Sequence, residues 1–164
     1  MKVPLFILLL LSLSLNAQQG VIVITGKTNV NTFKCTNTNL KTGIDLDSSK
    51  LPQLTLKIDD FDCRNKMMTS DFRKTLNSAK YPELHIRFTK LHKLSTSGYY
   101  QATLLVKFMN KTHPYSLTFF LDENQLVGNK KVLFTDFGIT PPKKMGGTIQ
   151  VKDALDLSVS LRSQ

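Results

Sequence analysis

The sequence predicts a mainly β fold, an antiparallel barrel of about eight strands with one short helix that caps an end. Three observations support this prediction. Apolar and polar residues alternate through about eight segments, which is the period of strands with one buried face. One further segment instead carries its apolar residues at helical spacing. Finally, a sandwich would leave sheet edges exposed, whereas a closed barrel removes them.

The first 17 residues predict export. A lysine at position 2 precedes a nearly unbroken apolar run over residues 5–15, and Asn-Ala-Gln follows at 16–18, as in a secretory signal peptide. The run is shorter than the roughly 20 residues of a membrane span. We expect cleavage after Ala17, within a residue or two. No cysteine follows that point closely, so we expect no lipid anchor and one mature domain over residues 18–164.

Eight segments of the sequence are expected to form the strands. In the third, Leu54, Leu56 and Ile58 share one face, and Thr55 and Lys57 lie on the other. In order, the segments are "VIVITGK" (21–27), "VNTFKC" (30–35), "PQLTLKID" (52–59), "ELHIRFTKL" (83–91), "YYQATLLVKFM" (99–109), "PYSLTFFL" (114–121), "QLVGNKKVLF" (125–134) and "TIQVKDALDLSVSL" (148–161).

The segment 67–82, "MMTSDFRKTLNSAKYP", breaks this alternation and predicts the helix. Ser70 is the expected N-cap, and Asp71 in the first turn would complement the helix dipole. Pro82 cannot continue a helix and disfavours helical geometry at Tyr81, so we expect a strand to start at Pro82. Met68, Phe72, Leu76 and Ala79 form the expected apolar stripe, and we expect Met68, Phe72 and Leu76 to face into the barrel.

Two cysteines remain in the mature chain, Cys35 and Cys63. Oxidising compartments favour a disulfide, and only one intramolecular pairing exists. In the chain-entropy model the link would stabilise the fold by roughly 3–4 kcal/mol. Two free thiols or a metal pair are the alternatives, and the lack of a nearby histidine argues against a metal.

The formal net charge is +10, and it falls to +9 when Lys2 leaves with the signal peptide. The lysines are scattered, so an ordinary solvated basic surface is the simplest interpretation. Outside the cytoplasm, anionic lipid is a more plausible partner than nucleic acid. Tyr99 and Tyr100 beside basic residues would suit base stacking, but export argues against nucleic-acid binding.

The sequence gives little support to catalysis. It lacks the Gly-x-Ser-x-Gly motif of a hydrolase nucleophile, and no cofactor or metal site is predicted. Its three histidines lack the spacing of a metal-binding helix, and three aspartates near Cys63 are better explained as a solvated strand end than as a calcium site. The histidines are His85, His92 and His113, and the aspartates are Asp59, Asp60 and Asp62.

Three blocks of the sequence resemble the YceI-like family. They are "GKTNVNTFKC", "IDDFDCRNKMMTSDFRKTLNSAKYPELHIRF" and "VLFTDFGITPPKKMGGTIQVKDALDLSVSL". The resemblance implies an extended lipocalin-like barrel in the bacterial periplasm that holds a long isoprenoid chain or a related amphiphile. The chain departs from the family at residues 109–114, where Gly-Val-Thr-Lys is common, and at 133–135, where an arginine often precedes "DFGI". These departures concern the identity of the ligand more than the fold.

On the residues alone, the inward faces would fill the barrel, whereas the resemblance favours a cavity. We therefore expect an exported binding protein, monomeric or homodimeric, that stores or carries a long-chain isoprenoid or other lipid without catalysis. A filled barrel that works through its basic face, and an enzyme that uses the acidic cluster and His113 at the barrel mouth, remain the alternatives. A strand phase wrong by one residue would exchange lining and outer face. The expected ligand-binding residues are Leu56, Ile58, Phe72, Leu76, Ile86, Phe88, Leu104, Val106, Phe108, Leu117 and Phe119.

Overall fold

The computed structural model describes residues 20–40 and 43–163. The expected signal peptide and its cleavage site lie outside these residues and stay predictions. The elements are β1 (Gly20–Thr28), β2 (Thr32–Leu40), β3 (Gln53–Lys57), the 3₁₀ helix η1 (Ile58–Asp60), α1 (Lys66–Thr75), β4 (Glu83–Lys93), β5 (Tyr99–Phe108), β6 (Lys111–Asp122), β7 (Gln125–Leu133), η2 (Phe134–Phe137), β8 (Lys143–Lys144), η3 (Met145–Gly147) and β9 (Ile149–Arg162).

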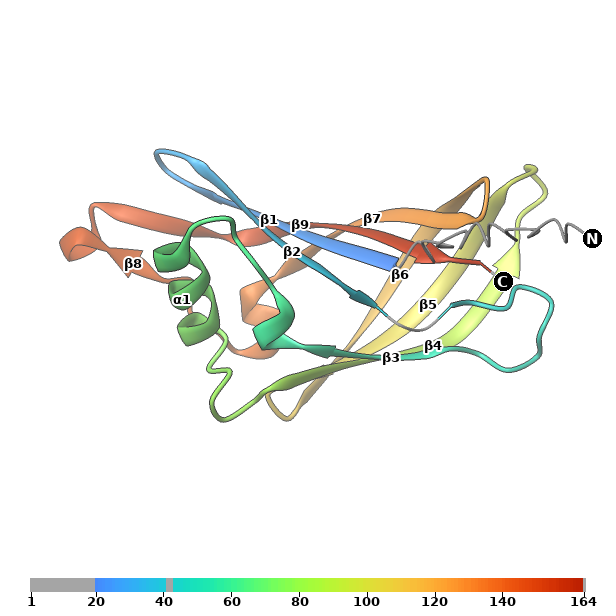
Figure 1. Cartoon of the computed structure of the whole chain (residues 1–164), viewed down its shortest axis with the longest axis horizontal. Helices are drawn as coiled ribbons and strands as arrows, with labels where there is room; N and C mark the ends of the chain where they lie inside the picture. Colours follow the sequence, from blue (N-terminus) through green and yellow to red (C-terminus); the bar gives the residue numbers. More distant parts are fainter. Residues whose placement is uncertain (1–19, 41–42, 164) are drawn as a thin grey trace, which may run out of the picture.

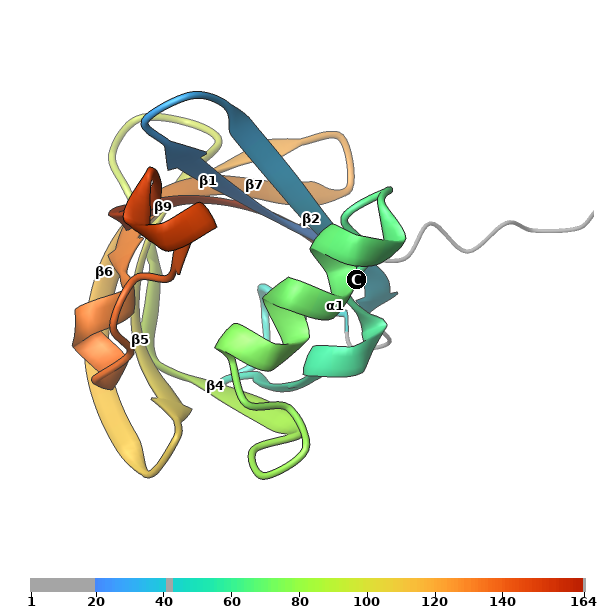
Figure 2. The same cartoon turned by 90° about the vertical axis from the view of Figure 1, so that its left-hand side faces the viewer.

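The strands form one antiparallel sheet in the order β2-β1-β9-β7-β6-β5-β4-β3, and the short β8 pairs with β9. The sheet curls into an elongated, nearly closed barrel, and α1 lies across one end of it (Figures 1 and 2). Each of the eight expected segments forms a strand of this path, and the inward faces carry the core. The predicted fold class is therefore confirmed.

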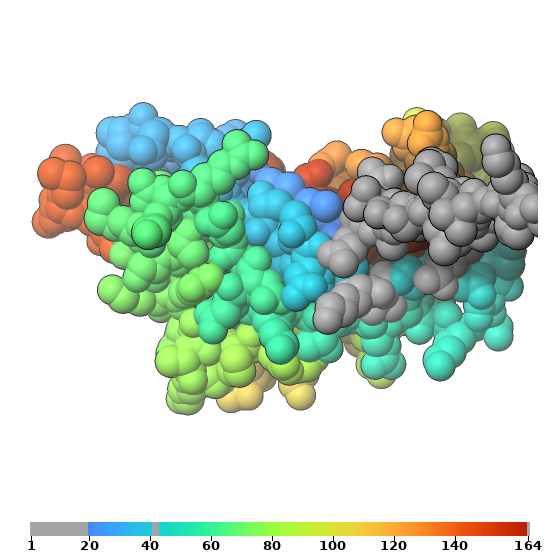
Figure 3. Space-filling view, viewed as in Figure 1, coloured from blue at the N-terminus to red at the C-terminus, as the bar shows by residue number. Residues whose placement is uncertain are grey.

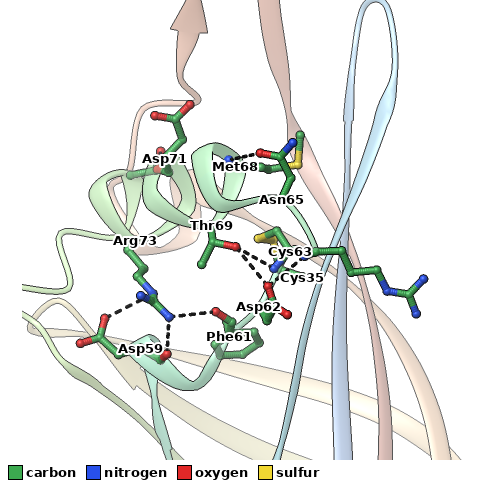
Figure 4. Close-up of a disulfide and its surroundings, with 12 residues drawn as sticks. Cys35, Asp59, Phe61, Asp62, Cys63, Asn65, Met68, Thr69, Asp71 and Arg73 are labelled. Carbon is green, nitrogen blue, oxygen red and sulfur yellow. Dashed lines mark hydrogen bonds and ion pairs between the residues drawn. A yellow bond between two sulfur atoms is a disulfide. The ribbon is translucent and has the colours of Figure 1, made fainter.

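The barrel has a seam where β2 and β3, the two ends of the sheet, face each other. In the part of the chain that the structure describes, no ladder joins β2 to β3. The bridge across the seam pairs Thr36 of β2 with Asp62, which follows η1, through backbone hydrogen bonds of 2.8 and 2.9 Å. The Cys35–Cys63 disulfide crosses the seam beside this bridge (Figure 4). The predicted disulfide is confirmed, and it serves as a covalent clasp of the barrel.

The wall is also split between β6 and β7. Their ladder joins Phe119–Asp122 to Gln125–Gly128 and goes no further. Gly128 is required at the last pair, because a Cβ there would lie 2.7 Å from a ring carbon of Phe119. Beyond that point side chains span the gap, and the Lys130 ammonium donates to the carbonyl oxygen of Ser116 at 2.8 Å. The segment η2 packs against both edges of the split.

The helix starts earlier than expected, and the predicted cap at Ser70 is wrong. Asn65 is the N-cap, and its side-chain oxygen accepts the backbone N–H of Met68 at 3.0 Å (Figure 4). A left-handed turn at Arg64 (φ 60°) aims the chain so that the helix begins at residue 66. Asp71 therefore lies in the middle of α1 rather than in its first turn.

The connection from α1 to β4 is also longer than expected. The helix ends at Thr75, and Asn77 (φ 49°) lies in the turn that follows. Pro82 does not open the strand but immediately precedes β4, and its carbonyl oxygen accepts the backbone N–H of Ile58 at 2.9 Å. Pro82 thereby ties the start of β4 to the end of β3.

Candidate functional site

An apolar cavity runs inside the barrel. It is lined by side chains from all eight long strands except β2, and from α1, η1 and η2. Every lining residue except Tyr115 and Lys130 has a hydrocarbon side chain. The cavity volume is about 110 Å³, well below the roughly 300–1,000 Å³ of typical ligand sites. Side chains therefore fill most of the interior.

All eleven residues expected to bind a ligand line this cavity. The phase assigned to β3, β4, β5 and β6 agrees with this lining, because a one-residue slip would have turned these side chains outward. Contact with a ligand stays a prediction for each of them. They are Leu56 of β3 and Ile58 of η1, Phe72 and the C-cap residue Leu76 of α1, Ile86 and Phe88 of β4, Leu104, Val106 and Phe108 of β5, and Leu117 and Phe119 of β6.

The expected set omitted one wall of the cavity. The same alternation in β1 and β9 places Ile22, Ile24 and the β9 residues in phase with Leu155 on the lining as well. No periodic signal identifies Phe134 and Phe137, because they lie in the short η2 turn, which brings both rings to the lining.

The two polar lining residues form hydrogen bonds at the β6/β7 split. Lys130 bonds to Ser116, as described above, and the Tyr115 hydroxyl donates to a carboxylate oxygen of Asp136 at 2.6 Å. Burial raises the pKa of Tyr115, and the carboxylate of Asp136 adds to the effect. His113 lies 3.4 Å from the other oxygen of Asp136. A tyrosine held neutral in this way is a hydrogen-bond donor rather than a base.

Each of the three aspartates near Cys63, which were expected to form a solvated strand end, makes an ion pair or a hydrogen bond with another residue. Asp59 pairs with Arg73 at 3.6 Å, Asp60 accepts the side-chain amide of Asn39, and Asp62 accepts the backbone N–H of Arg64 (Figure 4 shows the Arg73 and Asp62 contacts). Over residues 20–40 and 43–163, no group of three potential ligands is placed to hold a metal ion. The cluster holds the seam and the start of α1.

A second hollow opens at the α1 end of the barrel. It is an apolar groove of about 190 Å³ between α1, the β1–β2 hairpin and β8. Phe33, Met68, Pro142 and Val151 form much of its wall. Phe72 and Phe134 belong to both the groove and the inner cavity, so these two rings separate the hollows. None of the helices that the structure describes is long and apolar enough to cross a bilayer.

Comparison with known proteins gives one family and several structures. The family model for the YceI-like domain matches residues 13–162. Burkholderia cenocepacia BcnA superposes with a TM-score of 0.71 at 13% identity, covering 86% of this chain and 94% of its own. A Campylobacter jejuni YCEI protein gives 0.59 at 14% identity, covering 98% of this chain and 88% of its own. A polyisoprenoid-binding domain from Saccharophagus degradans, implicated in plant cell wall breakdown, gives 0.54 at 7% identity, covering 88% and 93%. No curated protein matches in sequence.

Proposed function

The chain belongs to the YceI-like family, and on that basis we propose that it is an exported periplasmic protein that binds a long-chain isoprenoid or other lipid. The barrel holds the molecule for transport or storage and does not transform it. The main observation that supports this proposal is the hydrocarbon lining, which continues from strand to strand around the barrel. The polyisoprenoid-binding domain of Saccharophagus degradans shares this fold.

The lining suits a ligand without charge along its length. Each CH₂ group removed from water contributes about 0.8 kcal/mol, so affinity grows with chain length. Tyr115 donates to Asp136 and Lys130 to Ser116, so neither is poised to attack or protonate a bound chain. These contacts support binding rather than catalysis. An anionic membrane surface is the partner from which such a molecule would be collected.

The small cavity volume favours a second candidate, a filled barrel that acts through its basic surface. About 110 Å³ is less than an engineered cavity of roughly 150 Å³ that binds benzene. A long chain therefore requires several lining side chains to move. The two candidates differ in one observable: only the first predicts a retained ligand.

Native mass spectrometry tests the proposal on protein exported from a bacterial host, before and after incubation with an isoprenoid alcohol or a fatty acid. A discrete adduct of several hundred daltons, released on unfolding, is the expected result. Leu104 and Leu105 provide a matched pair, because Leu104 lines the cavity and its neighbour does not. Leu104→Trp should abolish the adduct and Leu105→Trp should keep it, with folding of both checked by urea unfolding. An adduct in neither the wild type nor Leu105→Trp would overturn the proposal and favour the filled barrel.

A further inference from the structure

We propose that the α1 end of the barrel is the face that docks on an anionic lipid surface, with Val30, Met67 and Met145 entering the interface between basic side chains. This deepens the proposed function, because docking at this end gives a lipid ligand a route to the cavity. The strand faces and the opposite end of the barrel would stay in water.

Three exposed apolar side chains gather at this end although they come from distant parts of the sequence. Val30 is 64% exposed at the β1–β2 turn, Met67 is 73% exposed in the first turn of α1, and Met145 is 76% exposed in η3. Figures 1 to 3 show these three segments together at one end of the molecule. At other exposed positions apolar side chains can cover each other, as Tyr99 and Phe120 do with ring centroids 5.0 Å apart.

The backbone of η3 presents its side chain outward. Met145, Gly146 and Gly147 all have positive φ, at 51°, 65° and 95°. A tight left-handed turn of this kind is favourable for glycine and costly for methionine, so Met145 is held at a projecting tip at some conformational cost. Nothing lies within 4 Å of a Cβ built at either glycine, so the tip stands free of the barrel.

Each apolar tip is flanked by positive charge. Segments 27–31, 64–67 and 143–147 contain five basic residues and no acidic one. Among the described residues, Arg64, Lys66 and Lys143 take part in no ion pair, whereas Lys27 pairs with Asp156 at 3.6 Å and Lys144 with Asp71 at 2.9 Å. Unpaired cations around isolated apolar side chains are the composition of an interfacial lipid anchor.

The groove described above lies between these tips. Its apolar wall would face the acyl chains once the tips enter the membrane, and Phe72 and Phe134 separate it from the inner cavity. A chain that leaves the membrane at this end would meet these two rings first. A protein partner would need roughly 800 Å² of complementary surface on each side, whereas three separated tips require only a fluid interface.

Vesicle co-flotation tests the charge part of the proposal. Each basic residue near an anionic surface changes partitioning by about fivefold. Arg64→Asn/Lys66→Gln/Lys143→Gln should therefore weaken binding to phosphatidylglycerol vesicles on the order of 100-fold, and asparagine tolerates the positive φ of Arg64. Binding should also fall at 0.5 M salt and be absent on phosphatidylcholine.

Lys50→Gln/Lys90→Gln/Lys93→Gln is the matched control, because it removes the same charge from exposed positions in the loop before β3 and in the last residues of β4. Figure 1 shows these two segments towards the opposite end of the barrel. It should retain most of the binding. An equal loss in both triple variants would show that only net charge matters and would overturn the docking face. Absence of vesicle binding by the wild type would overturn it as well.

A tryptophan probe tests the orientation, since the sequence contains no tryptophan. The emission of Met67→Trp should shift to the blue on anionic vesicles, and that of Phe120→Trp, exposed on β6, should not. A shift at Phe120 alone would refute the orientation. Ligand retention is measured separately by native mass spectrometry, so a protein that keeps its adduct but ignores vesicles contradicts only this inference. One that binds vesicles through the α1 end but carries no adduct contradicts only the proposed function.

Discussion

Removal of the Cys35–Cys63 disulfide should lower the free energy of unfolding by about 3.5 kcal/mol. The two cysteines are 28 residues apart. In the chain-entropy model a closed loop of that length removes about 12 cal/mol/K from the unfolded chain, or about 3.6 kcal/mol at 298 K. Both cysteines are buried, and among the residues that the structure describes the Thr36–Asp62 bridge is the one backbone link across the seam. Few other contacts can take over the function of the clasp.

Urea unfolding of Cys35→Ala/Cys63→Ala, followed by circular dichroism, measures this loss. The slope of free energy against urea should rise, because the unlinked chain exposes more surface when it unfolds. Wild-type protein treated with a reductant should lose the same amount, and the double variant should not respond to the reductant. A loss below about 1 kcal/mol in both would refute the reasoning, and a loss in the variant alone would assign the effect to packing of the sulfur atoms.

Two further predictions concern the lining. Phe119 is fully buried and stacks on Phe88 at 6.2 Å, so Phe119→Ala should cost about 3–5 kcal/mol in urea unfolding. Part of that loss should return when a long-chain alcohol is added, and no recovery would speak against a ligand cavity. Tyr115 has a raised pKa in the folded protein, so its stabilising effect is complete below about pH 10 and declines as the pH rises further. Tyr115→Phe should flatten the fall in stability between about pH 10 and 12, and an unchanged profile would show that burial and Asp136 together do not raise the pKa of this hydroxyl.

Much of the fold can be predicted from the sequence because nearly every strand buries only one face. A side chain such as Ile86 or Leu104 that alternates with polar neighbours has one possible orientation in a one-sided sheet. The start of α1 was harder to predict, because Asn65 and Ser70 are equally good N-caps by residue type. The choice depends on the turn at Arg64 and on the contact of Thr69 with Asp62, which are set by the folded chain.

In the candidate site, too, residues on regular strands can be predicted from the sequence and residues in irregular segments cannot. Residues on regular strands were assigned to the cavity by their period, whereas Phe134 and Phe137 reach it from a 3₁₀ turn that has no such period. Lys130 illustrates a different difficulty, since a lysine on a strand normally indicates a solvent-facing position. It can occupy an inward position because the β6/β7 ladder ends at Gly128, and the end of a ladder is a tertiary property.

The wall of the barrel can widen at two places, the seam and the β6/β7 split, to admit a ligand larger than the cavity of about 110 Å³. The seam is held by a covalent bond, but the β6/β7 split is held by the bonds of Lys130 to Ser116 and of Tyr115 to Asp136. A hydrogen bond that involves a charged group contributes about 1.5–3 kcal/mol net, so burial of about four to eight CH₂ groups outweighs both. Amide hydrogen exchange should therefore change on ligand binding over residues 113–118 and 129–133 and stay constant in the β4/β5 ladder, which runs along both strands with one irregularity between Phe88 and Lys90. A uniform change in all strands would place the expansion in the side-chain packing instead of in the split.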